Sequence, residues 1–329
     1  KERREALRAK MAPNTVAVFF ANAERNRAND VDYIYHQDPD FYYLTGYKEP
    51  NSILVIFSEN QTNSEGKTYN EIMYVQERNA QAEQWNGYRL GVDGVQSQLG
   101  FEMAFNGKDF LESGIDFTSF DAVYFKEFKN DYRDNARDKA DLFDLIESFK
   151  IQTGYYLEDV AEGNAPLNNE LNTTNTIAAK KAKLDSKKLS IFMAGLRQIK
   201  LEEEMVLLKK AIRISAMGQR EIMKAMHPGM SETEIQGVHE FVYKKYGSEY
   251  EGYPSIVGAG NNGCVLHYIE NSKTQVENDL VLMDLGAEYH GYTADVTRTI
   301  PANGKFSPEQ KAIYDLVYEA QEAGIAAST

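Results

Sequence analysis

The chain has 329 residues, a net charge of −14 and a hydrophobic content of 42%, enough to build about two domain cores. The negative overall charge repels phosphates and no block of Lys and Arg stands out, which argues against nucleic-acid binding. No apolar run approaches about 18 residues, which argues against a transmembrane helix. The single cysteine, Cys264, excludes a disulfide framework and a cysteine-based zinc cluster, and we expect it to be buried by packing.

The first half of the chain alternates strand-like and helix-like segments, which predicts an α/β domain. The expected strands are Val16–Phe20, Ser52–Phe57, Glu71–Val75 and Asp121–Phe125, and the expected helix is Leu142–Phe149. Residues 164–175 are rich in Asn and Thr and are expected to form a loop. We place the domain boundary shortly after this loop, between residues 186 and 187.

The second half predicts two helices, then a sheet, then a last helix. Residues 202–226 carry apolar residues at helical spacing, among them Ile212 and Met223. Ser231-Glu-Thr-Glu234 predicts a capping box for a helix that has His239 on its polar side. Strands are expected at residues 254–258, 265–268, 281–287 and 292–300, and a final helix is expected after Ser307-Pro308.

The most informative segment begins at Asp284 and reads as two strands around a turn. If the turn is centred on residues 289 and 290, Asp284 and Asp295 lie opposite each other, with Cβ atoms about 4.5–5.5 Å apart. Two carboxylates at that distance repel each other unless a shared proton, an arginine or a divalent metal neutralises them. Arg298 should point to the other face of an ideal strand, which favours a metal. The alternative is that Asp284 lies in a bulge or faces solvent while Asp295 pairs elsewhere.

This segment resembles the first metal-binding hairpin of the M24 pita-bread metallopeptidases, and more narrowly that of the aminopeptidase P family. The matching positions are Asp284 in Met-Asp-Leu-Gly-Ala-Glu-Tyr and Asp295 in Tyr-Thr-Ala-Asp-Val-Thr-Arg-Thr-Ile-Pro. The segment from Asp30 to Gly46 is similar to the opening of the family's N-terminal domain, and Trp85 in Glu-Gln-Trp-Asn-Gly-Tyr-Arg-Leu-Gly matches another landmark.

The resemblance implies a fold and a metal site. It implies an α/β aminopeptidase P N-terminal domain over residues 1–186, followed by an incomplete α+β pita-bread domain over residues 187–329. In the family two aspartates, a histidine and two glutamates hold two divalent metals. Asp284 and Asp295 match the aspartates, and we expect the other three ligands beyond Thr329. Because the ligands are mostly oxygen atoms, two Mn²⁺ ions are favoured over Zn²⁺.

The resemblance also implies further site residues. His267 follows Gly-Ala-Gly-Asn-Asn-Gly-Cys-Val-Leu and matches a histidine that lies beside the metals and contacts substrate, so it is the catalytic candidate. Asp30 and Trp85 match residues that can reach the active site of a neighbouring subunit, and Arg197 matches an arginine at the domain junction, which makes all three candidate substrate contacts. The structural alternatives are that Asp30 caps a turn, Trp85 anchors a small core and Arg197 forms a salt bridge.

The implied activity of the full-length protein is metal-dependent hydrolysis of the N-terminal Xaa-Pro bond in peptides with proline at the second position. We expect the present chain to be inactive, because it carries two of the five metal ligands. One alternative is a catalytically silent member of the pita-bread fold that binds a peptide or protein. Another is a creatinase-like C–N hydrolase, which the paired aspartates disfavour. The family also implies a homo-oligomer, a dimer or a tetramer. The expected location is the cytoplasm, with the periplasm or secretion possible because the chain begins with Lys1.

Overall fold

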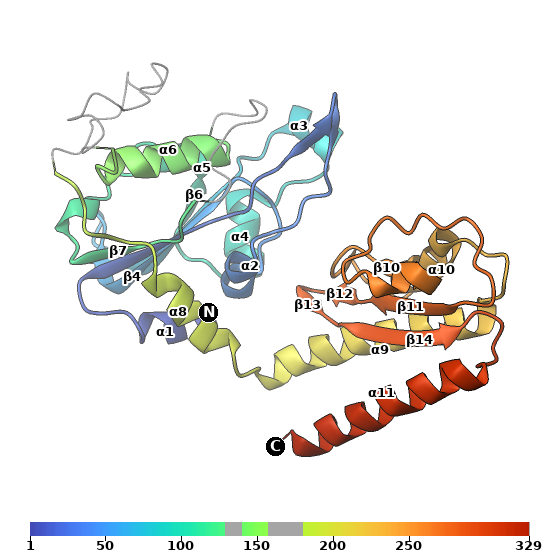
Figure 1. The fold of residues 1–329 in the computed structure, drawn as a ribbon. Helices are drawn as coiled ribbons and strands as arrows, with labels where there is room; N and C mark the ends of the chain where they lie inside the picture. Colours follow the sequence, from blue (N-terminus) through green and yellow to red (C-terminus); the bar gives the residue numbers. More distant parts are fainter. Residues whose placement is uncertain (129–139, 157–179, 329) are drawn as a thin grey trace. The chain divides into compact units, whose positions relative to one another are not determined.

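The computed structural model describes residues 1–128, 140–156 and 180–328, which form two compact units, Lys1–Ile199 and Lys200–Thr329 (Figure 1). The loop predicted at residues 164–175 lies outside the described residues. None of the described helices is long and apolar enough to cross a membrane.

A six-stranded mixed sheet forms the centre of the first unit, with the strand order β6-β5-β4-β1-β7-β8. Its strands are β1 (Thr15–Phe20), β4 (Ile53–Thr62), β5 (Thr68–Val75), β6 (Ala104–Asn106), β7 (Ala122–Tyr124) and β8 (Leu184–Asp185). Strand β1 is antiparallel to β4 and parallel to β7, which is itself parallel to β8. Strands β2 (Asn26–Ala28) and β3 (Val31–Asp32) form a separate ribbon.

Helices cover both faces of this sheet, as expected of an α/β domain. The helices of this unit are α1 (Glu2–Arg8), α2 (Pro39–Thr45), α3 (Ala80–Asn86), α4 (Gly91–Leu99), α5 (Gly107–Phe110), η1 (Phe117–Ser119), α6 (Leu142–Gln152) and α8 (Lys188–Arg197), and α3 alone among these has no buried residue. Alternate residues of β1 point to opposite faces. Ala17 and Phe19 join a core with α1, α2, α4 and α8, while Val16 and Val18 join a second core with α5 and α6. The strands and the helix expected in this half are all present.

Helix α8 belongs to the first unit by its packing. Leu189 and Met193 are buried in the same core as Leu7 of α1. The compact unit therefore extends to Ile199, beyond the boundary placed after residue 186, because the apolar face of α8 is covered by the N-terminal core.

The second unit packs its first two helices against one face of an antiparallel sheet with the order β10-β11-β14, and a second sheet has the order β13-β12-β9. Its helices are α9 (Glu202–Ala225), α10 (Glu232–Lys245), η2 (Gly260–Cys264) and α11 (Pro308–Ala327). Its strands are β9 (Tyr250–Glu251), β10 (Ile256–Ala259), β11 (Leu280–Leu285), β12 (Ala287–Tyr289), β13 (Tyr292–Thr293) and β14 (Val296–Pro301). Along β11, Val281, Met283 and Leu285 are fully buried in the core with α9 and α10. Asp284 therefore points to the other face of the sheet.

The strand predicted at residues 265–268 is wrong. The chain instead forms the 3-10 turn η2 and then continues without strand pairing as far as β11. A Cβ on Gly258 would lie 2.7 Å from the backbone nitrogen of Gly263, so η2 folds directly back onto β10. Cys264 is consequently exposed, which corrects the expectation that it is buried.

Helices α9 and α10 begin where they were predicted, but their buried faces differ from the predicted ones. Ile212 and Met223 are each 46% exposed, whereas His239 is fully buried rather than on a polar face. The two helices approach closely at Gly218, where an added Cβ would lie 2.8 Å from His239 Nδ1. Burial lowers the pKa of His239 to about 4. Neither ring nitrogen has a hydrogen-bond partner among the described residues.

Replacing His239 by leucine should reduce the acid sensitivity of the second unit. Below pH 6.5 and down to about 4, the unfolded chain binds a proton that folded His239 does not. The free energy of unfolding should therefore fall by about 1.4 kcal/mol for each pH unit of acidification. The free energy of unfolding, measured with urea at pH values between about 7 and about 5, should fall less steeply with acidification in His239→Leu than in the wild type. His227→Gln, a change at an exposed histidine, is the control, and equal slopes for wild type and His239→Leu would contradict this assignment.

Candidate metal centre

The hairpin has a different register from the predicted one. The structure pairs Asp284 with Thr297, so Asp295 is not directly opposite Asp284. The turn lies at His290-Gly291, one residue later than expected, and both residues have left-handed backbones with φ of 50° and 81°. Two left-handed residues at a two-residue turn are typical of tight β-hairpins, which accounts for the choice of this turn over the predicted one.

The side chain of Tyr253 nevertheless brings the two acids together. Its hydroxyl group donates a hydrogen bond of 2.6 Å to Asp284 Oδ1 and lies 3.3 Å from Asp295 Oδ1. Asp284 is half-buried on its strand, and Asp295 is exposed in the short link between β13 and β14. The two carboxylates thus meet at one phenol oxygen rather than across a hairpin ladder.

Gly286 allows this arrangement. A Cβ at this position would lie 1.7 Å from the carbonyl oxygen of Ala294 and 2.9 Å from the ring of Tyr253. The glycine separates β11 from β12, and its carbonyl accepts a hydrogen bond of 2.9 Å from the backbone N–H of Gly252. The absence of a side chain therefore lets the link that carries Asp295 approach the loop that carries Tyr253.

The charges of the two acids are not balanced by a basic side chain in the described part of the chain. Burial and the hydrogen bond to Asp284 raise the pKa of Tyr253, so the phenol keeps its single proton. Arg298 of β14 pairs in register with Met283, so its side chain points to the face of the sheet opposite that of Asp284. Two carboxylates at one point favour a cation between them.

Asp284 and Asp295 are the ligands that this part of the chain offers to such a cation. Carboxylate oxygens are suitable ligands for hard divalent metals. Within the described ranges, no group of three or more His, Cys, Asp or Glu side chains could hold a metal ion. The two acids therefore fit part of a metal centre, and a tight site needs further ligands.

His267 lies in the segment that follows η2. A Cβ on Gly263 would lie 3.5 Å from the Cβ of Leu282, which points to the same face of β11 as Asp284. The η2 turn therefore packs on the face of the sheet that carries the acid. His267 itself is exposed, as a residue that contacts a substrate must be.

The other three candidates lie in the first unit. Asp30 is exposed between β2 and β3, and Trp85 is 85% exposed on α3, so Trp85 does not anchor a core. Arg197 donates a hydrogen bond of 2.5 Å from its guanidinium group to Asp40, which is the salt bridge considered as its structural alternative. Asp30, Trp85 and Arg197 thus belong to the first unit, whereas Asp284 and Asp295 belong to the second.

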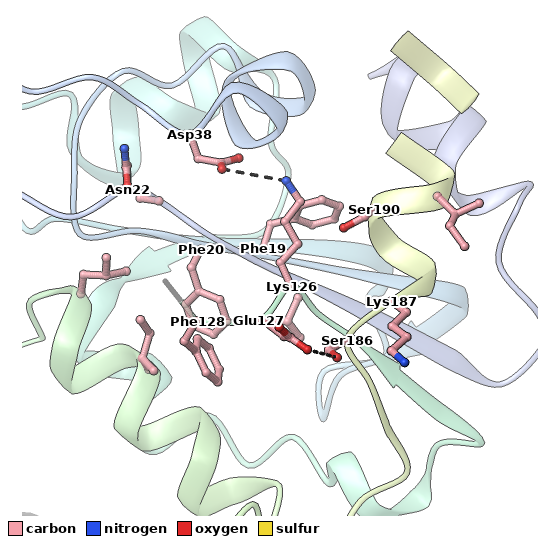
Figure 2. Close-up of a pocket in the computed structure, with 15 residues that line it drawn as sticks. Phe19, Phe20, Asn22, Asp38, Lys126, Glu127, Phe128, Ser186, Lys187 and Ser190 are labelled. Atoms are coloured by element: carbon pink, nitrogen blue, oxygen red, sulfur yellow. Dashed lines mark hydrogen bonds and ion pairs between the residues drawn. The ribbon is translucent and has the colours of Figure 1, made fainter. Parts of the chain in front are cut away.

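A pocket of about 540 Å³ lies in the first unit, where the chain leaves the carboxyl ends of the parallel strands β1, β7 and β8 (Figure 2). Lys126 Nζ lies 3.9 Å from Asp38, and Glu127 accepts a hydrogen bond of 3.3 Å from Ser186. The charged side chains that line the pocket are of both signs, and none of the predicted site residues lines it. This pocket is therefore not the metal centre.

Comparison with known proteins identifies the family. Residues 1–115 match the family model of the aminopeptidase P N-terminal domain, and residues 206–329 match that of metallopeptidase family M24. The chain is 32% identical over 326 residues to the Xaa-Pro aminopeptidase of Escherichia coli, covering 99% of this chain and 66% of that protein. The chain belongs to the aminopeptidase P family of M24 metallopeptidases.

Solved structures of this family agree with the fold. Aminopeptidase P from Escherichia coli in its low-pH form superposes with a TM-score of 0.79 at 30% identity, covering 99% of this chain and 67% of that one. Proline aminopeptidase P II from Yersinia pestis gives a TM-score of 0.78 at 31% identity, covering 98% and 66%. The prediction of an α/β N-terminal domain followed by a pita-bread domain is confirmed. The chain spans about two thirds of the length of these relatives.

Two contributors to the site were missed from the sequence. Tyr253 stands in a short loop, in Tyr-Glu-Gly-Tyr-Pro, and phenols are rarely considered beside metal-ligand patterns. Gly286 lies within the motif around Asp284 and was not predicted to contribute to the site. Its signal was available, because an isolated glycine inside a strand pattern suggests a bulge or a close backbone approach.

The change Gly286→Ala should destabilise the second unit by roughly 1–3 kcal/mol, because the new methyl group collides with the Ala294 carbonyl. Urea unfolding is the measurement. Gly237→Ala is the matched control, since Gly237 is exposed in α10 with open space around it, and alanine there should stabilise by roughly 0.5–1 kcal/mol. A Gly286→Ala variant as stable as the wild type would refute the proposed close approach.

Proposed function

We propose that the whole protein is a metal-dependent aminopeptidase that hydrolyses the bond between an N-terminal residue and a following proline. The observation that carries this proposal is the meeting of Asp284 and Asp295 at one phenol oxygen without a described basic partner. Its substrate class follows from relatives such as the Xaa-Pro aminopeptidase of Escherichia coli. A bond that precedes proline needs a dedicated enzyme, because proline lacks an N–H group and has a fixed φ. A peptidase that binds its substrate as an extended strand loses one hydrogen bond at proline.

Asp284 and Asp295 would each hold a divalent metal in this enzyme, together with ligands outside the described residues. The metals would polarise the scissile carbonyl and lower the pKa of an attacking water. We propose two ions and favour Mn²⁺, because the ligands contributed here are carboxylate oxygens. A zinc-substituted form of the Escherichia coli enzyme has been solved, so the metal identity must be measured for this protein.

His267 would contact the substrate from the segment that follows η2, the turn that packs on the acid-bearing face of the sheet. Its exposure suits this role, and an imidazole can donate or accept a hydrogen bond near neutral pH. Asp30 and Trp85 are proposed as substrate contacts supplied across an oligomer, since both are exposed. Arg197 is the weakest candidate because Asp40 already engages it. A homo-oligomer in the cytoplasm completes the proposal.

The change Asp284→Asn or Asp295→Asn should lower kcat/KM for the tripeptide Ala-Pro-Ala at least about 100-fold. Loss of a residue that only hydrogen-bonds to a metal ligand typically costs about 10–100-fold, and loss of the ligand itself should cost more. Asp315→Asn, at an exposed position on α11, is the control and should leave kcat/KM unchanged.

A metal chelator should abolish hydrolysis by the whole protein, and added Mn²⁺ should restore it. Retention of activity in both aspartate variants would refute the metal centre. Peptide binding by the wild type without any turnover would instead favour a catalytically silent member of the fold.

A further inference from the structure

A buried carboxylate holds the segment that carries His267. Glu232, at the start of α10, is fully buried, and its side chain accepts four hydrogen bonds. The donors are Ala259 N at 2.8 Å and Asn262 Nδ2 at 3.0 Å to Oε1, and the Tyr268 hydroxyl at 2.8 Å and Lys273 N at 2.8 Å to Oε2. The backbone N–H of Glu232 also donates to the carbonyl of Lys273 at 3.0 Å. One side chain therefore ties together both ends and two interior points of residues 259–273.

The partners of Glu232 are linked to one another. The Tyr268 hydroxyl accepts hydrogen bonds of 2.8 Å from Asn262 Nδ2 and from the backbone N–H of Ser272. Buried networks of this kind have directional geometry, so they fix a backbone more narrowly than apolar packing does. The carboxylate and the phenol thus form one polar anchor under the segment.

In the sequence, His267 lies between Asn262 and Tyr268, the two interior residues of the segment that bind Glu232. Tyr268, the next residue, is only 7% exposed, whereas Leu266 is 90% exposed and Val265 is 54% exposed. The residues around His267 therefore gain little from packing. The hydrogen bonds of Glu232 with Asn262 and Tyr268, on either side of His267 in the sequence, hold their backbone in place.

We propose that Glu232 is a positioning residue for His267, fixing the segment that presents the imidazole on the acid-bearing face of the sheet. This inference rests on the proposed function for the role of His267. The anchor itself rests only on the hydrogen bonds and burial of Glu232.

The role requires a carboxylate and not merely a side chain of the same shape. In Glu232→Gln, an amide nitrogen replaces one of the two oxygens. If it replaces Oε1 it faces the N–H of Ala259, and if it replaces Oε2 it faces the N–H of Lys273. Either orientation leaves a buried backbone donor without an acceptor.

Glu234→Gln is a matched control in the same helical turn. Glu234 is exposed and accepts a hydrogen bond of 3.2 Å from the Ser231 N–H, a role that glutamine fills equally well in a capping box. Tyr268→Phe is a second variant. It removes one of the four donors to Glu232 and also the acceptor of the Asn262 and Ser272 hydrogen bonds, and it leaves the other three hydrogen bonds to Glu232 in place.

Hydrogen–deuterium exchange tests the anchor. Glu232→Gln should speed exchange of the amides in residues 259–273 by about 10-fold, Tyr268→Phe should also speed it, and Glu234→Gln should leave it unchanged. The rest of α10 should keep its protection in all three. Unchanged exchange of residues 259–273 in Glu232→Gln would overturn the proposal. If Glu232→Gln does not fold, Tyr268→Phe decides in the same way.

A double-mutant cycle in the whole protein tests positioning. Glu232→Gln should lower kcat/KM for Ala-Pro-Ala about 10-fold when His267 is present, and should add little to His267→Ala. An equal loss in both backgrounds would show a general structural effect and overturn the positioning role. Absence of hydrolysis by the wild type would refute the proposed function instead, and the exchange experiment would then decide on the anchor alone.

Discussion

Two acidic side chains that share one neutral phenol are the constraint on which the second unit depends. Tyr253 has one proton to donate, so at neutral pH its hydroxyl cannot satisfy both Asp284 and Asp295. Repulsion between the two carboxylates grows as they are moved out of bulk water. Placing the two carboxylates together therefore destabilises the fold locally. A cation bound between them would offset this repulsion.

Helix α9 shows how the sheet tolerates that repulsion. Gln219 Nε2 donates to the carbonyls of Met283 at 3.3 Å and Val296 at 2.9 Å, which directly flank the two acids in sequence. Ser215, one turn earlier, accepts a hydrogen bond of 2.9 Å from Ala287 N on β12. The covered face of the sheet thus fixes the backbone, while the opposite face carries the charges. This division follows from the two-residue period of a strand.

The periodicity of the sequence was sufficient for most of the fold, because strand alternation and capping boxes are local signals. The hairpin register was not predictable in the same way. Adding residue numbers across a turn assumes an uninterrupted ladder, whereas Gly286 interrupts it and the left-handed pair His290-Gly291 moves the turn. Tyr253 enters from a loop distant in sequence, so no pattern within the hairpin could reveal it. His239 was misplaced because Gly218, on another helix, decides which face of α10 is buried.

The strand prediction for the segment after η2 is wrong for a related reason. Its apolar residues, Val265 and Leu266, suggest burial, but both are exposed, and a polar anchor replaces the hydrophobic one. A strand would have buried alternate side chains and turned neighbouring residues to opposite faces. An irregular segment held by Glu232 can instead direct several consecutive side chains outward. Such a segment suits a site that must meet a peptide, since its geometry is set by hydrogen bonds beneath it and its outer surface stays available for contact.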